Sequence, residues 1–542
     1  MGLVGLALCA ALMEIGWLAL WSLSGALSHS PLFTSAFLDG HPAAKQVFGL
    51  TLAIARGLLP DLPAAPLSEP LGSAAYTVPA VALAMAMLWL GLSYSTALVL
   101  LARGVARPAA ARWLVIIGGA LVFQVTLAFL PGLFSQDVFS YVAYGRLAAV
   151  HELNPYIWPP SVVPKDAVVA WVAEGWRTYT SPYGPLWVDT QWAMARLTGG
   201  MAIADQALAY RALANLLLLA NLGLLWAVLG RLTPLTRGQR TLGLAALAWN
   251  PLVLFEVSAN AHNDVLMVTL TLLALLLATH PRAGLLASAA MTLGALVKYL
   301  SGLGLVWLAL ALVARQETWL GRRLMLAAVG VVSAMLLVGL AAPWLELPDS
   351  LGPVLNETAG VGYVNSLPDS LTLALANSLS APVGPARTLE RLVVLVGFGV
   401  YLVWEARRVW TQASAAAVAR ALARSSLIFI LAVSTSVQTW YFCLPVAVAA
   451  ALGAHRRLTQ VTLAYSLLAL PALYLTYYLR DSTPVWVYLV YGVAPLLLLL
   501  APGLATGARA RAHVPAAEAV GHDEQRAGRH RLPRAIVEEA RR

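Results

Sequence analysis

Residues 241–279 read TLGLAALAWNPLVLFEVSANAHNDVLMVTLTLLALLLAT. The stretch holds two apolar runs, near 241–258 and 262–279, which a short polar connection joins. Each run is close to the length that an α-helix needs to cross a bilayer, roughly 20 mostly apolar residues. The stretch therefore predicts a pair of spanning helices with polar residues gathered at their turn.

Apolar runs of this kind recur along nearly the whole chain of 542 residues. Hydrophobic residues make up 60% of the sequence and charged residues only 11%, which is far more apolar than a water-soluble domain. Because the runs are continuous and do not alternate with polar residues, they exclude a transmembrane β-barrel. The expected fold is an all-α polytopic membrane protein with about fourteen spans. We place these near 3–27, 74–102, 113–131, 204–230, 241–258, 262–279, 284–298, 300–314, 324–343, 391–406, 421–436, 440–453, 459–478 and 485–505.

The net charge of +10 comes mostly from arginines in short connections, so membrane topology explains it and a nucleic-acid partner is not expected. Alternate connections carry these arginines, which the positive-inside rule places in the cytoplasm. They are Arg103, Arg107, Arg112, Arg231, Arg237, Arg240, Arg315, Arg322, Arg323, Arg407, Arg408, Arg420, Arg424, Arg456 and Arg457. The basic tail, residues 506–542, falls on the same side and is expected to be disordered.

The opposite side receives three long segments, 28–73, 132–203 and 344–390. Loops of this length in a compact protein are functional or disordered, and these are too rich in Trp, Tyr and Pro for disorder. We therefore expect one membrane-embedded domain over residues 1–505, with its active site on the outer face of the inner (plasma) membrane.

Asp137 is the most informative residue of the second long segment. It lies in SQDVFSY, residues 135–141, directly after the third predicted span and at the membrane boundary. A carboxylate held there is suited to general-base chemistry, in which it accepts a proton from an incoming hydroxyl. The alternative is structural, since Ser135 and Asp137 are both good helix caps.

A second polar cluster lies at the turn of the opening stretch. Glu256, Asn260, His262, Asn263 and Asp264 converge where two apolar helices meet. Ionisable groups in a membrane segment are costly, which makes them a functional hypothesis by default. Two alternatives stay open, a capped hairpin turn and a divalent metal site formed by Asp137, His262 and Asp264.

Lys298 is the single lysine within an apolar run, since the other two lysines of the chain are Lys45 and Lys165. Its position at the outer tip of a short hairpin would allow it to pair with a phosphate. The alternative is that the side chain extends toward the membrane interface, as lysines near helix ends often do.

Aromatic residues accompany these groups on the outer side. Gln438, Trp440 and Tyr441 occur in the outer turn QTWY, residues 438–441. Aromatic faces stack on sugar rings, although Trp and Tyr also gather at the headgroup level of any polytopic protein.

Together these stretches resemble the GT-C superfamily of membrane glycosyltransferases, and more narrowly the polyprenol-phosphate-mannose-dependent α-1,6-mannosyltransferases. The resemblance spans residues 130–450 and implies a GT-C type helical bundle with long outer loops. It is carried by SQDVFSYVAYG (135–145), NPY (154–156), SPYGPLW (181–187), WNPLVLFEVSANAHNDVLM (249–267), LVKY (296–299) and QTWY (438–441).

The resemblance implies an inverting transfer of mannose from a polyprenyl-phosphate donor in the bilayer to a glycolipid or glycan acceptor. Asp137 would be the catalytic base, and Lys298 with Arg146 would stabilise the donor phosphate. No cofactor is implied with certainty, and a divalent metal stays open. The positions expected to bind substrate are Tyr141, Asn154, Tyr156, Tyr183, His262, Asn263, Asp264, Gln438, Trp440 and Tyr441.

Two rival functions stay open at this point. One keeps the fold and uses another lipid-linked sugar as donor. The other is a polytopic transporter or lipid flippase, whose ionisable groups should lie near the midplane of the bilayer. The candidate residues here fall at the outer ends of the predicted helices instead.

Overall fold

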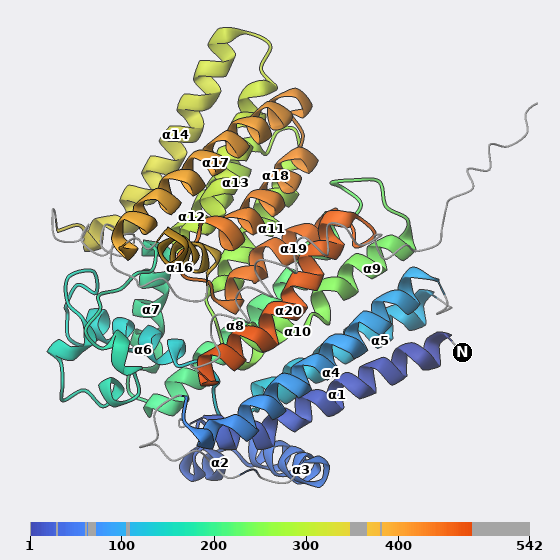
Figure 1. The fold of residues 1–542 in the computed structure, drawn as a ribbon, viewed down its shortest axis with the longest axis vertical. Coiled ribbons are helices and arrows are strands. Elements are labelled where there is room, and N and C mark those ends of the chain that lie inside the picture. The colour runs from blue at the N-terminus through green and yellow to red at the C-terminus, as the bar shows by residue number, and fades with distance from the viewer. Residues whose placement is uncertain are drawn as a thin grey trace, which may run out of the picture. The chain divides into compact units, whose positions relative to one another are not determined.

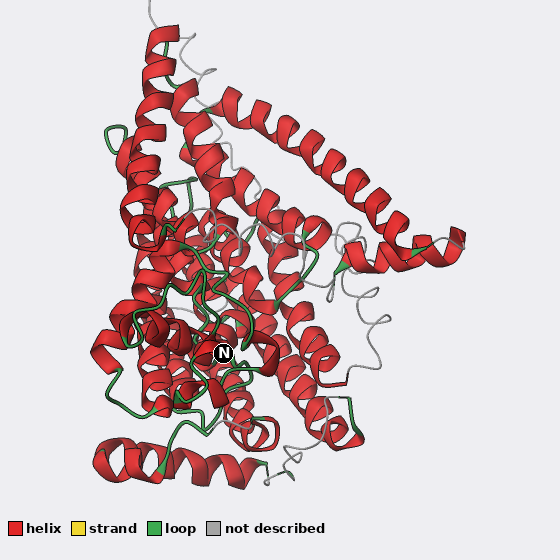
Figure 2. Ribbon diagram, turned by 90° about the vertical axis from the view of Figure 1, so that its left-hand side faces the viewer, coloured by secondary structure: helices red, strands yellow, loops and turns green. Residues whose placement is uncertain are grey.

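The computed structural model describes residues 2–28, 31–59, 62, 72–104, 109–346, 366–379 and 382–479. Helices make up the regular structure of these residues, and no strand occurs among them (Figure 2). The expected all-α class is therefore confirmed for the part of the chain described. The predicted span 485–505 and the tail 506–542 lie outside it.

The helices follow one another along the chain from α1 to α20, and two π-helical turns and two short 3-10 turns shape the site. These elements are α1 (Gly2–Leu27), α2 (Ser35–Gly40), α3 (Pro42–Leu58), α4 (Thr77–Ala102), α5 (Ala109–Ala128), α6 (Asp137–Ala149), α7 (Pro185–Thr198), α8 (Ile203–Val228), α9 (Arg237–Ala248), α10 (Pro251–Val253), α11 (Asp264–Ala278), α12 (Gly284–Val297), α13 (Gly302–Ala314), α14 (Trp319–Ala341), α16 (Leu367–Leu379), α17 (Val383–Gln412), α18 (Ala415–Ile428), α19 (Cys443–Leu452), α20 (Arg457–Leu479), η5 (Leu254–Ala259), η9 (Phe429–Val433), η6 (Tyr299–Ser301) and η10 (Thr439–Phe442).

Eight helices of the described chain are long and apolar enough to cross a membrane. They are Gly2–Leu27, Ala74–Ala102, Ala110–Ala128, Ile203–Val228, Arg237–Ala259, Trp319–Trp344, Ala415–Val433 and Arg457–Leu479. Four further predicted spans correspond to shorter apolar helices, Asp264–Ala278, Gly284–Val297, Tyr299–Ala314 and Thr439–Leu452. The predicted count of fourteen is not confirmed, because an apolar run in sequence does not reveal where a helix breaks.

The first three spans, α1, α4 and α5, run side by side along one face of the bundle (Figure 1). Trp21 of α1 donates its indole N–H to the carbonyl of Thr126 in α5 at 3.1 Å. The rings of Trp17 and Phe123 meet at 6.5 Å between the same two helices.

The span formed by α9, α10 and η5 lies at the centre of the bundle, with its most apolar window entirely buried. A helix that is apolar all round is expected to be enclosed by others. Trp249 donates to the carbonyl of Ile116 at 2.8 Å, and Tyr94 donates to that of Ala246 at 2.7 Å. These bonds from α4 and toward α5 fix the central span, which ends at the polar turn 260–263.

Four of the arginine-bearing connections pack against each other in two pairs. Arg315, after α13, donates to the carbonyl of Ala413 before α18 at 2.8 Å. Thr233, after α8, donates to the carbonyl of Leu452 at the end of α19. The alternation of arginine-bearing connections across the membrane stays a prediction.

The segment 132–203 forms helices α6 and α7, which pack against each other at one end of the bundle (Figure 1). A Cβ on Gly145 of α6 would lie 2.4 Å from the carbonyl oxygen of Gln191 in α7. Glycine is therefore required for the close approach of the two helices, which support the residues described next.

Candidate active site

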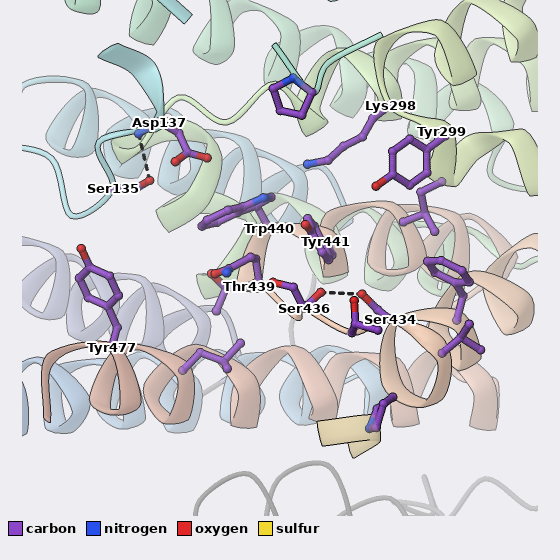
Figure 3. Close-up of a pocket in the computed structure, with 18 of the residues that line it drawn as sticks. Ser135, Asp137, Lys298, Tyr299, Ser434, Ser436, Thr439, Trp440, Tyr441 and Tyr477 are labelled. Atoms are coloured by element: carbon purple, nitrogen blue, oxygen red, sulfur yellow. Dashed lines mark hydrogen bonds between the residues drawn. The ribbon is translucent and has the colours of Figure 1, made fainter. Parts of the chain in front are cut away.

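A cavity of about 800 Å³ lies between the start of α6, the turn after α12, α17, η9, η10 and α20. Its walls include Asp137, Lys298, Gln438, Trp440 and Tyr441. In Figure 3 the Asp137 carboxylate and the Lys298 amine point toward one another, with Trp440 and Tyr441 beside the space between them. Five residues predicted from separate motifs therefore meet in one cavity.

The segment before Asp137 is clamped from two sides. Arg211 of α8, which is buried, donates to the carbonyls of Ala128, Leu130 and Gly132 at 3.2, 2.7 and 2.9 Å. Ala128 is the last residue of α5, where the carbonyl has no helical partner, and the other two carbonyls belong to the loop that follows. On the other side, the backbone N–H groups of residues 134 and 135 donate to the side-chain oxygen of Asn260 at 3.0 and 3.3 Å. The position of the Asp137 backbone is therefore set by two different spans.

Asp137 is the first residue of α6 and its side chain is 22% exposed, toward the cavity. The N-cap position is occupied by Gln136 without a side-chain cap, so the alternative in which Asp137 serves as a cap is not what the structure shows. Burial raises the pKa of the Asp137 carboxyl above its ordinary value, and the nearby charges of His262 and Lys298 offset this only in part. A carboxyl with a raised pKa is a better proton acceptor once ionised.

His262 lies behind Asp137 and does not line the cavity. Its Nδ1 is 3.7 Å from the Asp137 carboxylate, and its Nε2 is 3.3 Å from the carboxylate of Glu256. Trp440 stacks on the imidazole with ring centroids 3.8 Å apart and planes 18° from parallel. His262 therefore supports the cavity wall and has no surface on which a substrate could sit.

Lys298 closes the other side of the cavity. It stands between α12 and η6 with an extended backbone, and its Nζ lies 2.8 Å from a carboxylate oxygen of Asp264. The same Nζ lies 4.7 Å from the centre of the Tyr441 ring. The side chain is thus held in the cavity by a carboxylate and an aromatic face.

Three predicted substrate-binding residues form a buried layer beneath the cavity and do not line it. Asp264 and Asn263 are buried at the start of α11, where the backbone N–H of Asn263 faces the Tyr141 hydroxyl at 3.5 Å. Tyr141 packs edge-on against Tyr183, with ring centroids 5.3 Å apart, and Tyr183 does line the cavity.

Asn154 and Tyr156 also lie outside the cavity. The Asn154 amide donates to the carbonyl of Trp344 at 2.9 Å and to the carboxylate of Glu346 at 3.1 Å. The Tyr156 hydroxyl donates to the carbonyl of Tyr183 at 2.7 Å. The NPY stretch thus ties the 132–203 segment to the end of α14 and positions Tyr183.

The structure does not support the predicted phosphate-binding role of Arg146. Its guanidinium is paired with Asp166 at 2.9 Å and donates to the carbonyl of Gly199 at 3.1 Å. His151 completes the group, with its Nε2 2.7 Å from the same aspartate. Burial of Asp166 is outweighed by these hydrogen bonds, so its pKa is lowered. Arg146 faces this cluster because it lies toward the far end of α6 from Asp137.

The sequence left a divalent metal site open as an alternative. In the described part of the chain, no group of three or more His, Cys, Asp or Glu side chains is arranged to hold a metal ion. Asp137 and His262 approach each other to 3.7 Å, whereas the Asp264 carboxylate is paired with Lys298.

Two groups in the site were not among the residues predicted for it. Arg391 and Glu390 of α17 line the cavity, and Glu256 is buried behind it. The sequence gives one signal for the first pair, since RTLERLVVLV, residues 387–396, places charges directly before an apolar run.

Comparison with known proteins places the chain beside a set of bacterial enzymes. Residues 45–315 match the model of a family described as "Alpha-(1->6)-mannopyranosyltransferase, N-terminal domain". That range includes Asp137, His262 and Lys298. The chain is also 29% identical over 351 residues to alpha-(1->6)-mannopyranosyltransferase A of Mycobacterium tuberculosis, a match that covers 60% of this chain and 62% of the relative.

Two shorter matches agree. The chain is 32% identical over 161 residues to a probable alpha-(1->6)-mannopyranosyltransferase of Mycolicibacterium smegmatis, covering 28% of this chain and 26% of the relative. It is 29% identical over 160 residues to alpha-(1->6)-mannopyranosyltransferase A of Corynebacterium glutamicum, covering 29% and 31%. The matches thus span less than two thirds of each relative's length.

Proposed function

The chain belongs to the alpha-(1->6)-mannopyranosyltransferase family, and on that premise we propose that it transfers mannose from a polyprenyl-phosphate donor to a hydroxyl of a glycan or glycolipid. The observation that carries the proposal is the cavity in which Asp137 and Lys298 face each other (Figure 3). In such a transfer the acceptor hydroxyl loses a proton and the phosphate gains negative charge. A proton acceptor on one side of the cavity and a cation on the other suit these two events.

In the proposed reaction the acceptor oxygen attacks the anomeric carbon of a β-linked mannosyl phosphate. The bond from that carbon to the phosphate oxygen breaks, the polyprenyl phosphate leaves with the electron pair, and the product is an α-mannoside. Asp137 takes the proton of the acceptor hydroxyl. The mechanism is inverting because Asp137 acts as a base and forms no bond to the sugar.

Lys298 has a separate task in this mechanism. Negative charge grows on the phosphate oxygen as the bond to the sugar breaks, and a fixed ammonium group stabilises that charge most in a site that excludes water. Asp264 holds the Lys298 amine at 2.8 Å before the donor arrives, so the cation needs little reorganisation. The aromatic walls formed by Trp176, Tyr183 and Trp440 offer faces for sugar rings.

The apolar part of the cavity suits the lipid tail of the donor. Leu300, Val394, Leu395, Phe429 and Val433 continue the cavity along η6, α17 and η9. α17 also turns apolar side chains outward, among them Val396 and Val400 with 58% and 66% exposed. An isoprenoid chain that lies among these side chains would hold the phosphate next to Lys298.

The proposal is tested by transfer of radiolabelled mannose from polyprenyl-phosphate-mannose to a short α-mannoside by the purified protein in detergent. We expect transfer from the lipid donor and none from nucleotide-linked mannose. If an intact, monodisperse preparation transfers no mannose, the sugar assignment is wrong. Other lipid-linked sugars should then be assayed as donors, and after them the protein should be assayed for transport.

We also propose that the cavity opens to the outer face of the plasma membrane, because its residues follow the predicted outer segments and the positive-inside rule places the arginine-bearing connections in the cytoplasm. Lys165 is exposed in the 132–203 segment and Glu317 is exposed in the arginine-bearing connection after α13. In intact cells, a membrane-impermeant thiol reagent should label Lys165→Cys, whereas Glu317→Cys should react only after lysis. The native Cys9 and Cys443 are buried and should give little background. The reverse labelling pattern would overturn the orientation.

A further inference from the structure

Glu256 is a fully buried carboxylate whose role the proposed reaction leaves unexplained. It lies in η5, the π-helical turn that ends the central span, and such turns often occur at functional sites. The Glu256 side chain is buried and does not line the cavity.

Side chains from three other parts of the chain converge on this carboxylate. Thr439 of η10 donates to one oxygen. The Tyr474 hydroxyl of α20 and the Asn260 amide donate to the other at 3.4 and 3.3 Å. The side chain beside Glu256 that can carry positive charge is that of His262, whose Nε2 lies 3.3 Å away.

A buried charge at the end of a membrane span costs folding free energy, so we expect it to serve a function. Thr439 donates to one oxygen of Glu256 and Asn260 and Tyr474 donate to the other, so both oxygens act as acceptors, as in an ionised carboxylate. His262 is the neighbour that can become positively charged, when it takes up a proton. The arrangement therefore points to a role that requires the charge.

The imidazole of His262 is held in one orientation between two carboxylates. Trp440 fixes its plane by stacking at 3.8 Å. Nε2 then faces Glu256 at 3.3 Å and Nδ1 faces Asp137 at 3.7 Å, and neither contact has the geometry of a hydrogen bond. A neutral histidine with its proton on the nitrogen nearer to a carboxylate keeps the other nitrogen free to accept a proton.

We propose that Glu256 holds His262 with its proton on Nε2, so that Nδ1 accepts the proton that Asp137 removes from the acceptor hydroxyl. This inference rests on the proposed function for the identity of the reaction. It assigns Glu256 as a positioning residue and His262 as a proton relay behind the catalytic base.

The proton balance of the relay is complete within the site. The acceptor O–H bond breaks and the proton passes to the Asp137 carboxylate as the new glycosidic bond forms. It then moves to Nδ1 of His262, which becomes an imidazolium flanked by the Glu256 carboxylate. Asp137 is again ionised, and after the product leaves the proton passes back through Asp137 to solvent in the cavity.

The relay has further charged and titratable neighbours. Asp264 and Lys298 act on Asp137 electrostatically but are paired with each other. Tyr141 of α6 and Tyr474 of α20 present hydroxyl groups on either side. Across the cavity, α17 contributes a glutamate and an arginine, Glu390 and Arg391.

The kinetic test compares Glu256→Gln and His262→Gln with the wild-type enzyme. Each should lower kcat about 100-fold while the KM for the lipid donor stays unchanged, because the relay acts only after the donor is bound. The matched control is Glu405→Gln, which neutralises another buried carboxylate, one paired with Arg424 and outside the cavity. It should retain wild-type kcat. A folded Glu256→Gln enzyme with wild-type kcat would overturn the relay.

A second measurement tests the proposed proton relay in the absence of catalysis. In protein labelled with nitrogen-15 histidine, the signal lost in His262→Gln identifies His262 among the nine histidines. We expect a protonated Nε2 and an unprotonated Nδ1 in the wild type at neutral pH, and a mixture in Glu256→Gln. A proton on Nδ1 in the wild type contradicts the inference. Failure of mannose transfer by the wild type would instead refute the proposed function, so the two failures are distinguishable.

Discussion

Replacing Asp137 with asparagine is expected to lower mannose transfer by at least about 1,000-fold while the protein stays folded. The amide keeps the shape of the side chain but cannot accept the proton of the acceptor hydroxyl. Initial rates of transfer from polyprenyl-phosphate-mannose provide the measurement. Asp39→Asn is the matched control, because Asp39 is an exposed aspartate that pairs with Lys45 outside the cavity. Turnover of the Asp137→Asn enzyme within tenfold of the wild type would refute the assignment of the base.

The same variant is expected to show a characteristic pH dependence of stability. Burial raises the pKa of Asp137 in the folded protein. Folding therefore favours the protonated form of Asp137. The stability that this form contributes is present at low pH and is lost as the pH rises through the pKa of Asp137 in the folded protein. Asp137→Asn should thus unfold at the same or a higher temperature than the wild type at neutral pH, with the difference vanishing in acid. The rate of the wild-type enzyme should rise over the pH range in which Asp137 ionises.

Replacing Lys298 with methionine is expected to have the second large effect. The phosphate loses the cation that stabilises its developing charge, which should lower kcat by roughly 100- to 1,000-fold. The change also leaves the buried Asp264 carboxylate without its partner, and breaking a buried pair in this way costs roughly 3–5 kcal/mol. Transfer rates and thermal unfolding in detergent should therefore both fall.

The double variant Lys298→Met with Asp264→Asn separates the two effects. Removing the unpaired charge should restore the unfolding temperature toward that of the wild type, while transfer remains low. Lys165→Met, at an exposed lysine of the 132–203 segment, serves as the control and should change neither quantity. Recovery of transfer in the double variant would show that Lys298 acts only by balancing Asp264.

The sequence indicated the class of the fold because apolar runs long enough to cross a bilayer leave little choice but helices. It did not indicate which runs form one long helix and which break. The run that ends at Ala259 turns into a π-helix after Asn250 and Pro251, and the helices on either side of Lys298 are short. Breaks of this kind depend on hydrogen bonds made after the helices have packed.

For the candidate site, too, the sequence indicated residues but not how they lie relative to one another. Asp137, His262 and Lys298 stood out in the sequence because polar residues beside apolar runs are costly and therefore conspicuous. Their distances did not follow from that pattern, since residues 137 and 298 are far apart along the chain. Arg146 was assigned to the phosphate because it lies in the same segment as Asp137, whereas α6 directs it toward Asp166.

What the sequence by itself determined is therefore the all-helical, membrane-embedded class, the pattern of arginine-bearing connections and several of the residues that line the cavity, among them Asp137 and Lys298. These depend on local composition and on the cost of placing polar groups in lipid. Only the tertiary structure decided that Lys298 pairs with Asp264, that Glu256 and His262 stand behind Asp137, and that α17 closes the cavity. These contacts join side chains that are distant in the sequence, so they form only when the helices pack against one another.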